Sequence, residues 1–155
     1  MVLSLLIYLR KIPVVGKVFK FILLVCGLDL PASVKMGKNI KFPHNSLGTV
    51  IHPNTIIEDN VTIYHQVTIG RAEVMYPVCE TNFIDITVKQ GAILCAGAKI
   101  LSKEPHMVIG QNSIVAANSV LTHSIGENEI WGGVPARLLG HRKTDVLYAS
   151  ENEKI

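Results

Sequence analysis

Large apolar residues recur at every sixth position along most of the chain. They fall in four in-phase runs: Leu30, Met36 and Phe42; Ile51, Ile57, Ile63 and Ile69; Val88, Leu94 and Ile100; and Ile109, Val115 and Leu121. Small or β-branched residues often follow them four places later, among them Val34, Thr55, Val61, Ala92 and Ser113. A period of six fits neither an α-helix, at 3.6 residues per turn, nor one amphipathic strand, at two.

This period predicts an all-β solenoid in which each short strand sends one large and one small side chain inward. Turn-forming residues stand where its corners are expected: Gly37, Asn39, Asp59, Asn60, Gly97, Gly110 and Asn118. A single coil cannot bury its own apolar edges, so the core has to come from stacking of successive coils. The alternative is an ordinary β-rich domain with accidental spacing, and four in-phase runs argue against it.

Three interruptions of the period are candidate functional regions, because binding and catalytic residues concentrate in loops. The gaps from Phe42 to Ile51 and from Ile100 to Ile109 each hold three extra residues. The gap from Ile69 to Val88 is much longer and predicts a protruding loop at about 71–83.

Residues 1–28 are apolar and basic rather than periodic, and we expect them to form a short helical segment. They carry Arg10, Lys11, Lys17 and Lys20 and no acidic residue. A membrane-spanning helix needs about 20 mostly apolar residues, and two of these lysines interrupt the longer apolar stretch. Two interpretations stay open: helices lying on a membrane surface, or a cap on the first coil or on a neighbouring subunit. The predicted solenoid covers 29–142, and 143–155 form a tail.

The composition indicates a surface that is partly covered. Charged residues make up 17% of the chain and hydrophobic residues 48%, against roughly 25% charged in ordinary globular proteins, so oligomer contacts or a membrane are expected. The net charge of +3 is too small to favour nucleic acid as a partner. Cys26, Cys79 and Cys95 are widely spaced and read as reduced thiols. We expect a cytoplasmic protein, peripheral at the inner membrane face if 1–28 bind lipid.

Four stretches of the sequence carry a family resemblance: DLPASVKMGKNIKFPHNSLGTVIHP, IIEDNVTIYHQVTIG, GAILCAGAKIL and GVPARLLG. They resemble the hexapeptide-repeat acyltransferases, and look closest to the serine acetyltransferase-like branch, which includes O-acetyltransferases of surface polysaccharides. The resemblance implies a left-handed parallel β-helix, a homotrimer with active sites between subunits, and acetyl-CoA in a groove between neighbouring β-helices. The six-residue spacing alone shows neither the handedness nor the trimer.

The family's catalytic histidine falls on His44, inside the first interruption. A neutral imidazole can accept the proton of an acceptor hydroxyl as that hydroxyl attacks a thioester. The family's aspartate that orients this ring aligns on Asp29. The structural alternatives are an exposed loop histidine and an aspartate at a turn.

Coenzyme contacts are expected where small residues let pantetheine approach the backbone. The resemblance indicates Gly70, Arg71, Ala96, Ala98, Ala116 and Ala117, with Arg137, Arg142 and Lys143 meeting the phosphates. A backbone N–H near Gly70 would stabilise the developing oxyanion. Corners and core positions need small residues in any case, so the prediction concerns the site more than each residue.

The acceptor prediction rests on a departure from the family. Serine acetyltransferases present an Arg-His pair after the long loop to hold a carboxylate, and Ile84 and Asp85 stand there in this chain. An aspartate would repel a carboxylate and accept hydrogen bonds from sugar hydroxyls. We therefore expect a sugar or surface-polysaccharide precursor as acceptor, with L-serine as the alternative. His65 lies close enough in the repeat to face the same groove and contact the acceptor or the coenzyme, and the alternative is a corner or interface residue.

Three further interpretations were weighed. His44, His52 and His65 could serve as zinc ligands, as in γ-class carbonic anhydrases, but their spacing lacks that family's paired histidines, and no metal is expected. Cys79 could carry an acyl group, but no histidine is adjacent to lower its pKa. Direct transfer in a ternary complex fits better. A β-helix scaffold without activity is the last alternative.

Overall fold

The computed structural model describes residues 7, 9, 12, 16–72 and 82–143. Helix α2 (Gly16–Val25) comes first, and short strands in three sheets follow it. Sheet A consists of β1 (Leu28–Asp29), β3 (Thr49–Ile51), β6 (Thr68–Arg71), β9 (Lys99–Ser102) and β12 (Val120–Leu121). Sheet B consists of β2 (Lys35–Met36), β4 (Thr55–Ile57), β7 (Asp85–Val88) and β10 (His106–Ile109). Sheet C consists of β5 (Thr62–Ile63), β8 (Ile93–Leu94), β11 (Ile114–Val115), β13 (Glu129–Gly132) and β14 (Arg137–His141).

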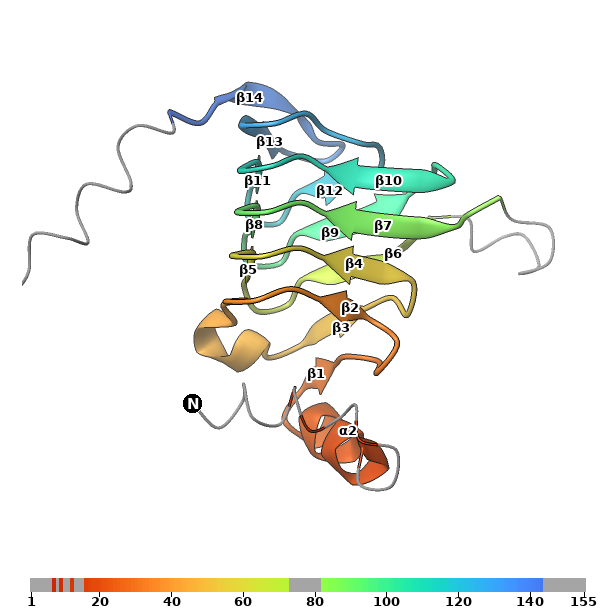
Figure 1. The fold of residues 1–155 in the computed structure, drawn as a ribbon. Helices are drawn as coiled ribbons and strands as arrows, with labels where there is room; N and C mark the ends of the chain where they lie inside the picture. Colours follow the sequence, from red (N-terminus) through yellow and green to blue (C-terminus); the bar gives the residue numbers. More distant parts are fainter. Residues whose placement is uncertain (1–6, 8, 10–11, 13–15, 73–81, 144–155) are drawn as a thin grey trace, which may run out of the picture.

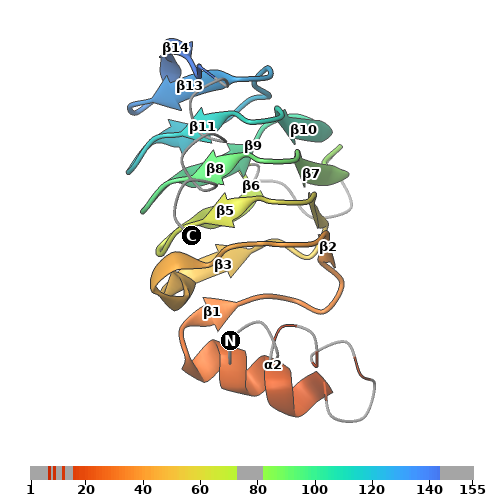
Figure 2. The same ribbon diagram turned by 60° about the vertical axis from the view of Figure 1, so that its left-hand side comes forward.

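The three sheets are the faces of a prism, because the chain visits A, B and C in turn as it climbs (Figures 1 and 2). In Figure 1 it runs leftwards along sheet B in front while rising, which is a left-handed course. The strands of successive coils pair in parallel, and β14 closes the last coil by pairing antiparallel with β13. The predicted left-handed parallel β-helix with a short N-terminal helix is confirmed.

The large apolar residues of the six-residue period stack in columns, one column inside each sheet. In sheet A, Ile51 lies beside Ile69, Ile69 beside Ile100, and Ile100 beside Leu121. Sheet B stacks Met36, Ile57, Val88 and Ile109, and sheet C stacks Ile63, Leu94 and Val115. All of them except Met36 are buried. The large apolar residues of the six-residue period therefore form the core.

The corners turn on residues with left-handed backbone. We name each corner by the sheets it joins: AB, BC and CA. At the BC corner, Asn60, Gly91, Asn112 and Asn128 have positive φ values in successive coils. Asparagine and glycine tolerate this conformation better than other residues, which explains why turn formers alternate with the apolar positions.

The interruptions of the period lie at two of these corners. The first forms the 3-10 turn η1 (Pro43–Ser46) at the CA corner, and the second lies between β9 and β10 at the AB corner. The predicted long loop also leaves the AB corner, after β6 ends at Arg71. Most of that loop, with Cys79, lies outside the described residues, as does the tail from 144 onwards.

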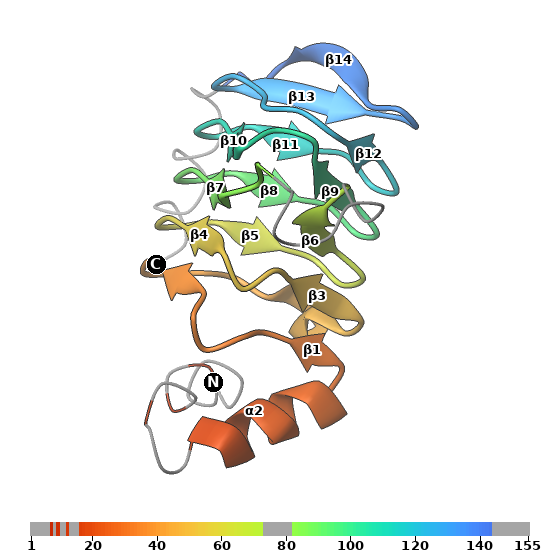
Figure 3. The ribbon, with the colours of Figure 1, turned by 90° about the vertical axis from the view of Figure 1, so that its right-hand side faces the viewer.

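Helix α2 lies across the base of the prism, beneath β1 (Figure 3). Its Leu23 is fully buried and joins the core with Leu28 of β1. Its other side exposes four apolar residues, Val18, Phe21, Leu24 and Val25. Among the described helices, none is long and apolar enough to cross a membrane.

Candidate active site at the CA corner

Five coils contribute one turn each to the CA corner. His44 belongs to the first turn and His65 to the second, and the next two turns contain Ala96 with Gly97 and Ala117 with Asn118. Gly133 lies in the last turn, after β13. The corner therefore has two imidazoles at one end and small side chains along the rest.

The turn that carries His44 has a strained backbone. His44, Asn45 and Ser46 have φ values of 54°, 55° and 47°, three left-handed residues in succession without a glycine. Such backbone persists only where the surroundings hold it, and it clusters at functional sites. The three extra residues of the first interruption thus form an outward turn that exposes His44.

Neighbouring coils hold this turn in place. The buried Ser46 hydroxyl donates to the carbonyl of Ile63 at 2.6 Å. Directly after the turn, the carbonyl of Leu47 accepts the N–H of Gln66 at 2.8 Å, and the N–H of Gly48 donates to the carbonyl of Gly27 at 2.7 Å. Bonds to the coil above and the segment below fix where His44 emerges.

His65 packs against His44. Their ring centroids are 5.4 Å apart and the ring planes are nearly perpendicular, at 88°. The Nδ1 atom of His65 is buried, with no hydrogen-bond partner in the described part of the chain. The sequence predicted that His65 faces the groove, but not that the two rings touch.

Asp29 is not hydrogen-bonded to His44 in the described part of the chain. It lies half-buried in β1, beside Val50 of β3, at the start of the coil whose end carries His44. Within the described residues, no hydrogen bond joins the two side chains. The predicted pair thus shares a coil without direct contact.

The small residues predicted to line the coenzyme groove differ in what they can offer. Ala117 is exposed and Ala96 half-buried at the corner, while Ala116 is half-buried and donates its N–H to Trp131. Ala98 is different, because its side chain is fully buried, its N–H donates to Cys95 and its carbonyl accepts from Thr68. Its side chain belongs to the core, so a coenzyme contact of Ala98 stays a prediction that concerns its backbone.

The basic residues near the C-terminal end divide in the same way. Arg137 is exposed at the start of β14 and donates only to the adjacent carbonyl of Ala136, at 3.0 Å. Arg142 donates to the carbonyls of Gly91 and Asn112 at 3.2 and 3.3 Å. Arg142 therefore holds the BC corner together, whereas Arg137 remains available to a phosphate.

Gly70, Arg71 and Asp85 lie at the AB corner, across sheet A from His44. Arg71 lies close enough to His52 for its charge to act on that ring, and burial together with this charge lowers the pKa of His52 below 6.5. The Nδ1 of His52 accepts the N–H of Asn54 at 3.1 Å, and its ring meets Phe83 edge-on. Within one chain, Gly70, Arg71 and Asp85 therefore do not lie beside His44.

A side-chain contact at the AB corner was missed by sequence reasoning. The parallel pairing of β7 with β10 puts Asp85 opposite His106, and Oδ1 and Nδ1 are 3.2 Å apart. In the sequence, only the position of His106 at the end of the second interruption pointed to this contact. The pairing with Asp85 depends on the register between coils.

The geometry does not gather the three histidines considered as zinc ligands. His52 lies at the AB corner with Asn54 and Phe83, while His44 and His65 lie at the CA corner. Across the described residues, no three His, Cys, Asp or Glu side chains are grouped to hold a metal ion.

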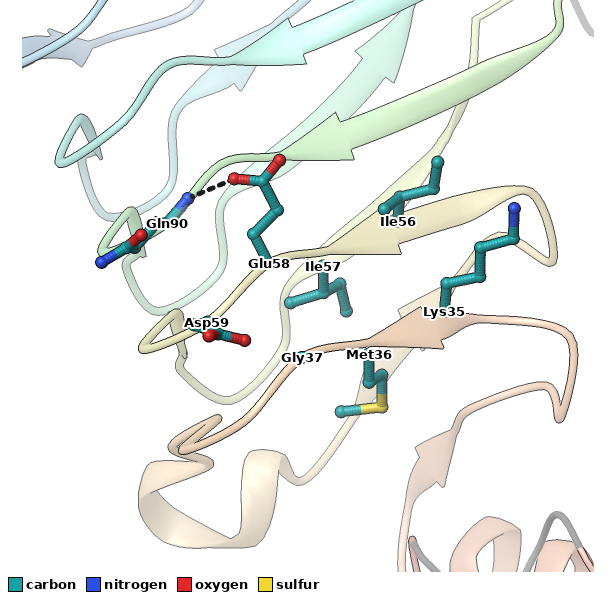
Figure 4. A pocket seen from close by; sticks show the side chains of 8 residues that line it. All are labelled: Lys35, Met36, Gly37, Ile56, Ile57, Glu58, Asp59 and Gln90. Carbon is teal, nitrogen blue, oxygen red and sulfur yellow. Dashed lines mark hydrogen bonds between the residues drawn. The ribbon is translucent and has the colours of Figure 1, made fainter.

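Sheet B is hollowed on its outer side. A depression of about 350 Å³ lies between the first coils, where Lys35 and Ile56 line one end and Glu58, Asp59 and Gln90 the other (Figure 4). A second depression of about 260 Å³ reaches the AB corner and is lined by Lys35, Asn54, Ile84 and Asp85, among others. Neither depression includes His44.

No family model matches the chain. It is 31% identical over 118 residues to a putative serine acetyltransferase of Schizosaccharomyces pombe, a match that covers 74% of the chain and 39% of the relative. A serine acetyltransferase of Brucella abortus, solved with coenzyme A, superposes with a TM-score of 0.69 at 26% identity and covers 91% of the chain and 54% of that structure. A serine O-acetyltransferase of Brucella melitensis, described as a bacterial transferase hexapeptide repeat, gives 0.70 at 27% identity, with 91% and 55% covered.

The chain thus spans about two fifths of the curated relative and about half of each solved structure. With the repeat, the parallel sheets and these similarities together, the chain belongs to the serine acetyltransferase-like hexapeptide-repeat acyltransferases.

Proposed function

We propose that this protein transfers an acetyl group from acetyl-CoA to a hydroxyl group of a small acceptor, with His44 as the general base. The proposal rests on the left-handed turn that exposes His44 and is fixed by hydrogen bonds. This turn lies beside His65 at a corner whose further turns carry small side chains. The relatives support it, because those named above are serine acetyltransferases and one of them was solved with coenzyme A.

Acetyl transfer to a hydroxyl group requires a base near that hydroxyl and a groove that holds acetyl-CoA beside it. Acetyl-CoA, when bound, supplies an acetyl thioester. His44 takes the proton of the acceptor hydroxyl at its unprotonated ring nitrogen, and later gives that proton to the departing thiolate. Such a base typically contributes about 10²- to 10⁴-fold to the rate. Asp29 and a backbone N–H near Gly70 remain candidates for orienting the ring and stabilising the oxyanion.

The coenzyme groove is proposed along the CA corner, from Ala96 and Ala117 towards Arg137. A Cβ at Gly97 would collide with the side chain of Asn118, so the corner has no room for larger residues there. Short side chains leave backbone amides open to pantetheine, and the exposed guanidinium of Arg137 suits a phosphate. Arg71 remains a proposed contact from the AB corner.

L-serine is the acceptor that the relatives favour, and it replaces our first expectation of a sugar as the leading candidate. A sugar hydroxyl stays a second candidate because Ile84 and Asp85 occupy the positions of the family's carboxylate-binding pair. Release of free thiol from acetyl-CoA should be followed with L-serine and with methyl glycosides. We expect acceptor-dependent release with L-serine, and release only with the glycosides would reverse the order of the candidates.

We further propose a homotrimer in which the CA corner of one subunit meets the AB corner of the next. The proposal would explain why Gly70, Arg71 and Asp85 lie away from His44 within one chain. Light scattering should then give about three times the 17.0 kDa of the chain. A monomer mass in solution would contradict it.

The outer side of α2 is proposed to rest on an anionic membrane surface. Phe21 is 65% exposed and Val25 71%, and residues 1–28 carry four basic and no acidic side chains. Apolar area and positive charge together favour peripheral binding to anionic lipid. Flotation with phosphatidylglycerol liposomes should recover the protein, and a Phe21→Glu variant should stay behind. No flotation of the wild type, or equal flotation of the two proteins, would contradict the proposal for this face.

A further inference from the structure

The turn between β2 and β3 sets where His44 leaves the chain, but the ring of His44 needs a support of its own. The side chain is exposed and, within the described residues, forms no hydrogen bond. An exposed imidazole can change rotamer unless a neighbour packs against it, and a base works only while it points at the proton that it takes. The neighbour that the structure places beside it is the ring of His65.

His65 comes from a part of the β-helix whose backbone is fixed from both sides. It lies half-buried in the second coil, at the corner between β5 and β6. Its carbonyl accepts the N–H of Gly97, in the coil above, at 3.0 Å. The N–H of the next residue, Gln66, donates to the carbonyl of Leu47 at 2.8 Å. The ring of His65 therefore stands on a fixed corner, whereas His44 stands on an outward turn.

The two rings meet in a geometry that is favourable for aromatic groups. Their centroids are 5.4 Å apart and their planes 88°, so the edge of one ring meets the face of the other. Aromatic pairs prefer such edge-to-face contacts, with centroids about 4.5–7 Å apart. The buried Nδ1 of His65 has no hydrogen-bond partner in the described part of the chain, so this nitrogen does not orient His44. What His65 offers to His44 is the flat ring.

We propose that His65 is a positioning residue, whose ring packs against the imidazole of His44 and holds it in the orientation in which it accepts the proton of the acceptor hydroxyl. In this role, His65 acts through His44 and not on the acceptor. A catalytic group has to be held within about 0.5 Å of its productive position, and packing by a residue that is itself fixed is a usual means to do so. This inference rests on the proposed acetyl transfer by His44.

Three substitutions at position 65 separate the ring from its nitrogens. His65→Ala removes the ring, His65→Gln keeps a polar group without a ring, and His65→Phe keeps a flat ring without nitrogens. His123→Ala is the matched control, because His123 is also half-buried and meets the ring of Trp131 edge-on, at 4.9 Å and 76°. His123 follows β12, at the other end of the prism from His44 (Figure 3). Circular dichroism melting checks that each variant is folded.

The kinetic test follows thiol release with the better of L-serine and a methyl glycoside. We expect kcat to fall about 10- to 100-fold in His65→Ala and His65→Gln, the loss typical of a misplaced catalytic group. It should stay within about threefold of the wild type in His65→Phe and in the control, and KM for both substrates should stay within about twofold throughout. Wild-type kcat in His65→Ala or His65→Gln would overturn the inference. A kcat as low in His65→Phe as in His65→Ala, or a change in KM alone, would also overturn it.

A second measurement needs no turnover. In the folded protein, the ring of His65 should shift the NMR signals of the carbon-bound ring protons of His44, which are assigned by their loss in His44→Ala. We expect these signals to move in His65→Ala and His65→Gln and to stay displaced in His65→Phe. Signals that do not move in His65→Ala would overturn the inference while the proposed function stands. Wild-type protein without acceptor-dependent thiol release would instead overturn the proposed function, and the positioning role with it.

Discussion

At the scale of single residues, the position of His44 depends on a backbone that is unfavourable by itself. A left-handed residue other than glycine or asparagine costs roughly 1–2 kcal/mol, and His44 and Ser46 adopt this conformation on either side of a left-handed Asn45. The surrounding hydrogen bonds have to offset that cost, and the Ser46 hydroxyl is the one that is fully buried. The exposure of His44 is therefore tied to a bond made by its neighbour.

Ser46→Ala is predicted to lower the free energy of unfolding by about 1–3 kcal/mol, because the carbonyl of Ile63 loses its buried donor. Ser33→Ala is the matched control, since the Ser33 hydroxyl donates to the carbonyl of Pro53 at an exposed position, and it should cost well under about 1 kcal/mol. Urea titration measures both. Equal losses in the two variants would mean that the His44 turn is not held by Ser46.

His52 is predicted to make the protein less stable as the pH falls below 6.5. Its pKa is lowered in the folded state by burial and by Arg71, so the unfolded chain takes up the proton first and unfolding is favoured. Protonation of Nδ1 also removes its hydrogen bond from Asn54. The loss begins near 6.5 and ends at the folded-state pKa. Melting temperatures between pH 7.5 and 5 should fall less steeply in His52→Gln, and equally steep curves would contradict the assignment.

The sequence allowed prediction of residues that belong to a repeating pattern or a family motif. It did not allow prediction of contacts between coils. His44 stood out because the family's catalytic histidine aligns with it, inside an interruption of the six-residue period. The contact of His65 with His44 and the pairing of Asp85 with His106 depend on the register between coils, which the period alone does not give. The burial of Ala98 could not be predicted, because a small residue in the core and one lining a groove look alike in a sequence.

At the scale of elements, each corner is built by residues whose side chains leave room for the coil above. Gly97 illustrates this at the CA corner, with a φ of +72° and the Asn118 side chain of the next coil directly over it. Any side chain there would be strained by its own backbone, and its Cβ would displace the Asn118 side chain. The small residues along the proposed groove are thus needed by the fold as well as by a ligand.

Gly97→Ala is predicted to destabilise the protein by at least about 1–2 kcal/mol, the cost of a left-handed alanine, with the displacement of Asn118 adding to it. Gly70→Ala is the control for stability, because its Cβ would meet only Leu101, at an ordinary 3.9 Å. Thermal melting of both variants checks the prediction. A Gly97→Ala protein as stable as wild type would show that the corner can accommodate a side chain.

The elements themselves were largely predictable. Strands fell on the six-residue period because each face of the prism is one period long, and both three-residue gaps became corner turns. The exact strand limits were not predictable, since most strands are only two to four residues long. Their ends are set by the positive φ values at the corners, which asparagine, glutamine and glycine all supply.

At the scale of the whole molecule, the candidate residues divide between two corners of one prism. His44, His65 and Ala117 lie at the CA corner, while Arg71 and Asp85 lie at the AB corner. In the proposed trimer, the CA corner of one subunit and the AB corner of the next would together form each site, and a closed ring of subunits would repeat this contact. This arrangement links the proposed trimer directly to the proposed activity.

The measurement that tests the central claim most directly is acceptor-dependent release of free thiol from acetyl-CoA by wild-type protein and by His44→Ala. We predict release by the wild type and a rate lower by about 10²- to 10⁴-fold in the variant, with melting temperatures alike because His44 is exposed. Equal rates in the two proteins, or no release by the wild type with L-serine or a glycoside, would contradict the account.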